Sequence, residues 1–145
     1  ILYHEPVSRR TSLGGACEYA GRILRKRSVI FLLSDFLDDN YEKKMAVLAK
    51  KHDLIALQVL DDSEFELPDA GVLCLYDPET GKRGWINTSS PQIRSAYKAR
   101  IELTQKALSE SFKAMSCDHI LFRGGDSHIS ALRHFFLSRA ARYHR

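Results

Sequence analysis

The sequence predicts an α/β domain built on a mostly parallel sheet, and two observations carry this prediction. Two apolar segments, 28–35 and 54–60, have the continuous hydrophobicity of strands buried on both faces of a parallel sheet. A segment with helical spacing lies between them, so the order strand–helix–strand predicts a parallel pair joined by a right-handed crossover. The chain has 145 residues, 44% of them hydrophobic and 28% charged, which suits one domain with its own core.

The two helices of this first half have their own signals. Small and apolar residues recur at helical spacing from 13 to 24, and Thr11 or Ser12 offers the N-cap. Polar residues after the first strand offer caps for the second helix. The cap candidates and the apolar side expected for that helix are Asp38, Asp39 and Asn40, then Tyr41, Met45, Leu48 and Ala49.

From Gly71 the pattern changes to two short strands, 72–76 and 84–87, around a turn at 77–81, which predicts a small β-hairpin insertion. Pro91 is expected to start a long helix, because proline suits the first helical turn. The face predicted to point inward is Tyr97, Ile101, Leu108, Phe112 and Met115.

A short third core strand is predicted at 120–122. After Gly124 and Gly125, Asp126 or Ser127 offers the cap of a last helix. The inner face expected for that helix is Ile129, Leu132, Phe136, Ala140 and Tyr143.

The composition excludes a membrane span and a disulfide framework. The longest apolar run, 29–33, is far shorter than the ~20 residues that cross a bilayer, so we expect no membrane segment in this chain. The three cysteines, Cys17, Cys74 and Cys117, are odd in number and widely spaced. They are therefore expected to be reduced thiols of a cytoplasmic protein that pack as small hydrophobic side chains.

The formal net charge of +4 raises the question of nucleic-acid binding. Cations late in a helix are stabilised by the helix dipole by ~0.3–1 kcal/mol each, which accounts for the basic clusters without a ligand. No RNP-like, zinc-finger or helix-turn-helix signature accompanies them, so no nucleic-acid partner is expected, and binding through the basic helices stays an alternative. The clusters are Arg22, Arg25, Lys26 and Arg27, then Arg133, Arg139, Arg142 and Arg145.

Asp35 is the main candidate for a functional side chain. It directly follows the first strand, and ligands of open parallel sheets bind beyond the carboxyl ends of the strands. Thr11, before the preceding helix, is expected on the same edge, and a carboxylate with hydroxyl groups suits Mg²⁺ or Mn²⁺. The alternative is that Asp35 and Thr11 only cap turns and helices.

Other candidates have weaker signals. Cys117 and His119, with His128 and His134, match no standard zinc spacing. Ser34 lacks the Gly-x-Ser-x-Gly context of a hydrolase nucleophile, and no nucleophile–base pair supports the alternative of a metal-dependent hydrolase that uses strand-end carboxylates. Trp85 in the hairpin is expected either to pack locally or to form an exposed contact surface.

Several motifs in order along the chain resemble one family. They are Thr11-Ser12-Leu13, Leu32-Leu33-Ser34-Asp35-Phe36-Leu37-Asp38, His52-Asp53-Leu54-Ile55-Ala56, Glu66-Leu67-Pro68, Asp77-Pro78-Glu79-Thr80-Gly81 and Phe135-Phe136-Leu137-Ser138-Arg139. Together they resemble the bacterial domain-of-unknown-function fifty-eight family of von Willebrand factor A-like proteins, which are associated with MoxR-type AAA+ ATPases. The resemblance implies a doubly wound, Rossmann-like sheet with flanking helices.

The resemblance also implies a metal-ion-dependent adhesion site, in which an Asp-x-Ser-x-Ser motif, a threonine and an aspartate hold a divalent cation. Thr11 matches the threonine and Asp35 the aspartate, while Ser34 and Asp38 are expected to contact the partner. The chain contains no Asp-x-Ser-x-Ser motif. We therefore expect residues 1–145 to be the C-terminal part of the domain without its first strands. Mg²⁺ or Mn²⁺ is expected in the full-length protein, and residues 1–145 alone are expected to bind it weakly or not at all.

The function implied is a non-enzymatic protein-interaction module that works with a MoxR-type AAA+ ATPase. Without a first strand beside it, the segment 29–35 is expected to be an open edge, which is a template for pairing with another copy of the chain. Self-association through this strand is therefore expected. Whether the full-length protein carries a membrane anchor upstream stays open.

Overall fold

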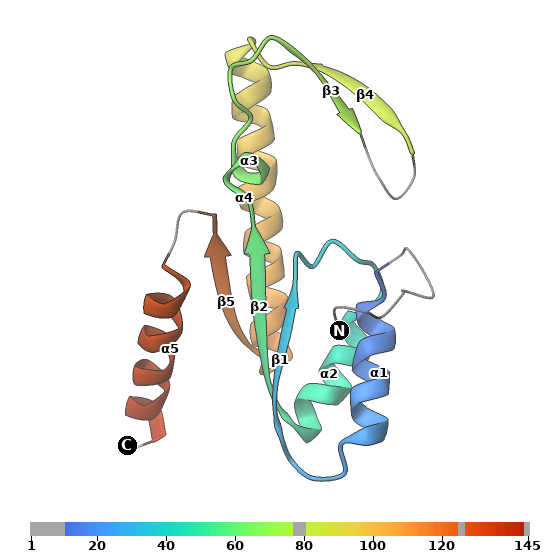
Figure 1. Ribbon diagram of the computed structural model, residues 1–145, viewed down its shortest axis with the longest axis vertical. Helices are drawn as coiled ribbons and strands as arrows, with labels where there is room; N and C mark the ends of the chain where they lie inside the picture. The colour runs from blue at the N-terminus through green and yellow to red at the C-terminus, as the bar shows by residue number, and fades with distance from the viewer. Residues whose placement is uncertain (1–10, 77–80, 125–126, 144–145) are drawn as a thin grey trace, which may run out of the picture.

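The computed structural model describes residues 11–76, 81–124 and 127–143, which form one three-stranded parallel sheet, a two-stranded antiparallel hairpin and flanking helices (Figure 1). The prediction of an α/β fold with a mostly parallel sheet and a small hairpin is confirmed. The elements are α1 (Leu13–Ile23), β1 (Val29–Ser34), α2 (Glu42–Lys51), β2 (Asp53–Leu60), α3 (Asp62–Phe65), β3 (Val72–Tyr76), β4 (Arg83–Asn87), α4 (Pro91–Ala114), β5 (Asp118–Arg123) and α5 (His128–Tyr143).

The parallel sheet has the strand order β1-β2-β5, with β2 in the centre. β1 pairs with β2 from Val29↔Asp53 to Ser34↔Gln58, and β2 pairs with β5 from Ile55↔Asp118 onwards. This confirms the parallel strand–helix–strand unit that the two apolar segments predicted. Because all three strands run the same way, their carboxyl ends lie at one edge of the sheet.

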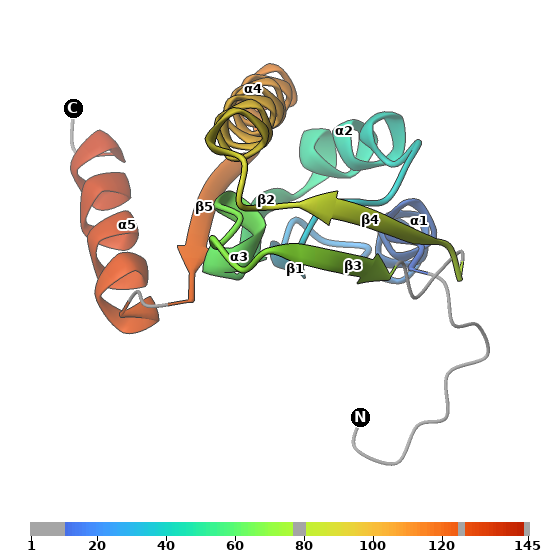
Figure 2. The same cartoon turned by 90° about the horizontal axis from the view of Figure 1, so that it is seen from above.

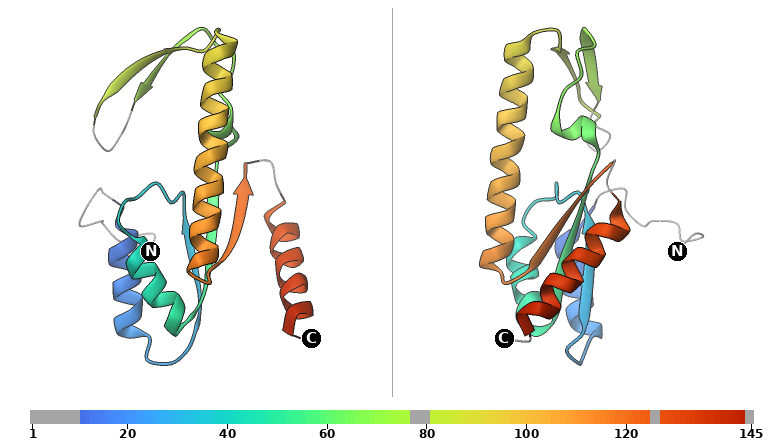
Figure 3. Two further views of the ribbon diagram at one scale, coloured as in Figure 1. Left: turned by 180° about the vertical axis from the view of Figure 1, so that it is seen from behind. Right: turned by 90° about the vertical axis from the view of Figure 1, so that its left-hand side faces the viewer.

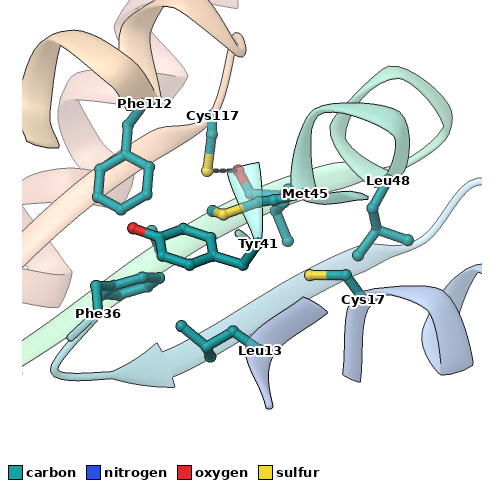
Figure 4. Close-up of a cluster of buried hydrophobic side chains, with 10 residues drawn as sticks. Leu13, Cys17, Phe36, Tyr41, Met45, Leu48, Phe112 and Cys117 are labelled. Carbon is teal, nitrogen blue, oxygen red and sulfur yellow. Dashed lines mark hydrogen bonds between the residues drawn. The ribbon is translucent and has the colours of Figure 1, made fainter. Parts of the chain in front are cut away.

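The larger core lies between the sheet and the helices α1, α2 and α4. Full burial of one large apolar side chain contributes about 1.5–3 kcal/mol, so this cluster is a main source of stability. Figure 4 shows the aromatic rings of this core gathered beside the sulfur-containing side chains. Its buried members are Leu13, Cys17, Phe36, Tyr41, Met45, Leu48, Leu54, Ala56, Phe112 and Cys117.

The opposite face of the sheet carries a smaller core under α5. Ala131, Leu132 and Phe135 of this helix pack against side chains of β2 and β5. Figure 2 shows α5 at the β5 end of the sheet, and Figure 3 shows it on the side away from α4. The strand residues in this core are Ile55, Leu57, Ile120 and Phe122.

The prediction that β1 is buried on both faces is wrong. Val29, Phe31 and Leu33 are 57%, 43% and 63% exposed, whereas the intervening Ile30 and Leu32 pack on the larger core. The reason is the position of β1 at the edge of the sheet, where α5 does not reach across to cover it. Phe31 has a ring partner on α5, Phe136, at 6.2 Å between centroids.

The inner face predicted for α5 is wrong at three positions. Ile129 is 81% exposed, Phe136 is 45% exposed and Ala140 is also exposed. The helix is rotated so that Ala131 and Phe135 face the sheet instead. The helix begins behind Ser127, whose hydroxyl accepts a hydrogen bond from the Ser130 amide at 3.4 Å.

Several further expectations have different outcomes. Cys17 and Cys117 are buried as expected, but Cys74 is exposed because it lies on the hairpin, away from both cores. The long helix does begin at Pro91, with Ser90 as its N-cap, yet only Phe112 of its predicted face is fully buried. The hairpin turn at 77–80, the cap candidate Asp126 with Gly125, and the side chains of Arg142, Tyr143 and Arg145 lie outside the described residues.

Arg139 attaches α5 to the sheet through charge. Its guanidinium forms an ion pair with Asp53 at the start of β2, and a second with Asp118 at the start of β5, at 3.4 Å. The Arg139 side chain is 13% exposed, so it is a structural cation rather than part of a solvated basic surface.

We predict that Arg139→Met lowers the free energy of unfolding by about 2 kcal/mol or more, because it leaves two half-buried carboxylates without their cation. Urea unfolding monitored by circular dichroism measures this loss. Arg133→Met, an exposed arginine on the same helix, is the control and is expected to change stability by less than about 0.5 kcal/mol. Equal effects of the two substitutions would contradict the role of the ion pairs.

We also predict that the chain self-associates through the exposed edge and apolar face of β1. Leu33→Lys is expected to weaken this association, because a charged side chain on an edge strand opposes pairing with a second copy. Sedimentation velocity over a range of concentrations measures it. Leu103→Lys, an equally exposed leucine on α4, is the control; a concentration-independent monomer of the unsubstituted chain would refute the prediction.

Candidate functional site at the carboxyl end of β1

Ser34 and Asp35 form a tight turn where β1 ends. The Ser34 hydroxyl donates to Asp35 Oδ1 at 3.3 Å, and the Leu37 amide donates to the same oxygen at 3.1 Å. The Phe36 amide in turn donates to Ser34 Oγ at 3.1 Å. Side-chain bonds to following amides are typical of Asp and Ser in turns. They hold the Asp35 carboxylate at the surface with Oδ1 engaged.

Asp38 ties this loop to the start of α1. The Leu13 amide donates to Asp38 Oδ2 at 2.7 Å, and the Asp39 amide donates to Oδ1 at 2.9 Å. The first turn of α1 has no acidic residue of its own, so Asp38 supplies the negative charge that favours a helix N-terminus. The prediction that Asp38 caps the following helix is therefore wrong, since α2 begins after Tyr41 without a side-chain cap.

Thr11 lies immediately before Ser12, which is the N-cap of α1 and accepts a hydrogen bond from the Gly15 amide at 3.2 Å. Thr11 itself is exposed. The hydrogen bond between the Leu13 amide and Asp38 places the amino end of α1 beside the loop between β1 and α2.

Phe36 gives the loop its shape. This residue has a φ of 60°, a left-handed backbone conformation that is rare and strained for an aromatic side chain. Its ring is buried and packs on Phe112 at 5.0 Å and on Tyr41 at 5.9 Å between centroids. Packing in the core thus offsets the backbone strain, and Asp35 points outward because its neighbour points inward.

Gln58 connects the same loop to the interior. Its Nε2 donates to the Asp35 carbonyl at 3.3 Å, and its Oε1 lies 3.1 Å from His119 Nε2. Since a carbonyl oxygen only accepts, His119 carries the proton on Nε2 in this arrangement. Gln58 is 1% exposed, and burial of an amide costs free energy unless both ends are bonded. Sequence reasoning did not single out Gln58, although it is the one polar residue in the run 54–60.

His119 packs against Phe112, with 4.7 Å between the ring centroids. Desolvation by this burial lowers the pKa of His119 below its ordinary value. The ring is therefore held neutral near pH 7, which matches its role as a donor to Gln58.

The donor atoms at this edge suit a hard cation in kind but not in number. Asp35 Oδ2 and the Thr11 hydroxyl are oxygen ligands, whereas such cations take about six. In the ranges that the structure describes, no three His, Cys, Asp or Glu side chains gather as a metal site. The weak zinc candidate is further opposed by Cys117, whose pKa burial raises to about 12 and whose Sγ bonds the Leu54 carbonyl at 3.3 Å.

Trp85 of the hairpin is 75% exposed, so the expectation that it packs locally is wrong, and the contact surface stays a prediction. On the same hairpin face, the Arg83 guanidinium lies 5.7 Å from the centre of the Tyr76 ring.

None of the described helices combines the length and the hydrophobicity needed to cross a bilayer.

Comparison with known proteins gives a family but no activity. A family model described as "Protein of unknown function DUF58" matches residues 1–107. An uncharacterised protein of Mycobacterium avium is 38% identical over 77 residues, covering 52% of this chain and 46% of that protein. Uncharacterised proteins of Mycobacterium bovis and Mycobacterium tuberculosis are 35% identical over 77 residues, covering 24% of their length. The chain thus matches less than half the length of these relatives, and no solved structure matches it significantly.

The lowered pKa of His119 predicts a pH dependence of stability. The unfolded chain binds this proton more readily than the folded chain, so the contribution of neutral His119 is present above the ordinary pKa of about 6.5 and is lost as the pH falls below it. We predict that the free energy of unfolding, measured by urea titration, falls between about pH 7 and about pH 5.

His119→Gln should show a smaller fall over this range, because its amide donates a hydrogen bond without titrating. His134→Gln, at an exposed position of α5, is the control and should keep the full pH dependence. An unchanged fall in His119→Gln would refute the assignment.

Proposed function

This chain belongs to the DUF58 family of proteins of unknown function, and we propose that it is a non-enzymatic protein-interaction module whose partner binds at the carboxyl end of β1. One observation carries the proposal. Asp35 presents an exposed carboxylate on a loop that is attached to the rest of the fold at three points. The Phe36 side chain is buried, Gln58 donates to the Asp35 carbonyl, and Asp38 accepts from the Leu13 amide. Rigid support of an exposed charged group is what a specific binding surface requires.

The non-enzymatic part of the proposal is supported by the surroundings of Ser34. Its hydroxyl donates to Asp35 and accepts from the Phe36 amide, so its bonds serve the turn. The histidine connected to this loop, His119, bonds to Gln58 and is half-buried in the core rather than placed beside Ser34. Nucleophilic catalysis needs the base within hydrogen-bond reach of the nucleophile.

A divalent cation, Mg²⁺ or Mn²⁺, is part of this proposal. Asp35 and Thr11 would contribute two of its oxygen ligands, with water and a carboxylate of the partner among the others. Ser34 and Asp38 would then lie at the rim of the contact. Two protein ligands are too few for tight binding, so the chain alone is expected to bind the cation weakly. The complex between the chain and its partner is expected to form only when the cation is present.

The partner that we propose is a MoxR-type AAA+ ATPase. Support for it comes from the motifs along the chain that resemble the von Willebrand factor A-like proteins associated with such ATPases. Binding to this partner would be measured by calorimetry in MnCl₂ and again in EDTA.

We predict that the ATPase binds the chain in MnCl₂ but not in EDTA, and that Asp35→Ala abolishes the cation-dependent binding. The physical reason is that alanine removes the only charged ligand which the chain contributes in this proposal. Asp39→Ala is the matched control, since Asp39 is an exposed carboxylate of the same loop. Equal binding by Asp35→Ala, or binding that survives EDTA, would refute the proposed site.

A further inference from the structure

A groove of about 410 Å³ runs between α1 and α2, and its lining does not include Asp35 or Thr11. Its floor is apolar: Cys17 and Leu48 are almost fully buried beneath it, while Val47 is 55% exposed and forms a wall. Gly21 adds depth, because a Cβ atom at that position would lie 3.6 Å from Leu48 Cδ1. An exposed wall above a buried apolar floor is the form of a pocket for an apolar side chain.

The rim of this groove is basic. Arg22 of α1 and Lys43 and Lys51 of α2 line it, and within the described parts of the chain no carboxylate lies at ion-pair distance from these three cations. The one acidic residue of the rim, Glu18, is already neutralised by Lys44 at 3.1 Å. The surface therefore combines an apolar centre with an unbalanced positive border.

We propose that this groove binds an acidic amphipathic helix of a partner protein. Apolar side chains on one face of that helix would lie on the floor beside Val47, and its acidic side chains would meet Arg22, Lys43 and Lys51. Helix-in-groove binding of this kind uses anchors at i, i+3 or i+4 and i+7. The lining consists of helices alone, so it offers no strand edge to which an extended peptide could add.

The apolar floor favours a protein over a nucleic acid. Binding to a phosphate backbone comes from cations and gains nothing from Val47 or Leu48. Negative groups on the partner complement the rim, whereas an apolar floor is complemented only by apolar side chains. The proposal needs no divalent cation and does not rest on the site at Asp35.

The test uses a labelled synthetic peptide of about 14 residues, with leucine at helical spacing and glutamate elsewhere, titrated with the 145-residue chain in EDTA. Fluorescence anisotropy measures the affinity. We expect Val47→Glu to weaken binding about tenfold or more, because it places a negative charge on the apolar wall. The pair Lys43→Glu with Lys51→Glu should have a comparable effect, while Lys106→Glu, an exposed lysine of α4, should have none.

Two controls keep the test decisive. A peptide of the same composition with its leucines scrambled out of helical spacing should bind at least about tenfold more weakly. Circular dichroism checks that each variant is folded, and Val47→Ser, which removes apolar area without adding charge, replaces Val47→Glu if the latter unfolds. Absence of peptide binding, equal binding of the scrambled peptide, or displacement of the peptide by duplex DNA with no effect of Val47→Ser would overturn the proposal. Because EDTA is present throughout, failure here is distinct from failure of the cation site.

Discussion

The burial of β2 on both faces is the constraint on which the rest of the structure depends. Leu54 and Ala56 face the core under α1, α2 and α4, while Ile55 and Leu57 face α5. A strand with two apolar faces is stable only when helices cover both. The α5 helix is therefore a necessary part of the fold, and its Arg139 ion pairs fix it at the amino ends of β2 and β5. β1 does not need helices on both faces, because it is an edge strand and only its face with Ile30 and Leu32 packs on the core.

The one polar residue in this central strand links the core to the candidate site. Gln58 must satisfy both ends of its buried amide, and it does so with the Asp35 carbonyl and His119. The loop after β1 is thus part of the hydrogen-bonding of the interior, although its carboxylate faces solvent. Phe36 has the same effect through packing, since its ring can enter the core only if the backbone takes its strained conformation.

Local signals in the sequence predicted the elements well, and non-local contacts account for the errors. Capping residues, Pro91 and apolar periodicity lie within a few residues of the structure they specify, so the hairpin and the longer helices α1, α2, α4 and α5 were predicted. The four-residue helix α3 was not predicted. An apolar run has the same pattern at the edge of a sheet as in its centre, so the pattern predicted burial of both faces of β1. The edge position of β1 was expected only from the family resemblance. At the site, the topology rule singled out Asp35, but the bonds of Asp38 and Gln58 span 25 and 61 residues of sequence, which spacing does not reveal.

The two proposed surfaces share one rigid element, α1. Its amino end is bonded to the loop that carries Asp35, and its side lines the basic groove. Leu13 and Cys17 of this helix are buried in the larger core, so a movement of α1 would disrupt that packing. Coupling between sites requires two states with different affinities, and core packing of this kind favours a single position of the helix. A partner that engages both surfaces therefore gains from the proximity of its second contact, as in bivalent binding, rather than from a conformational change.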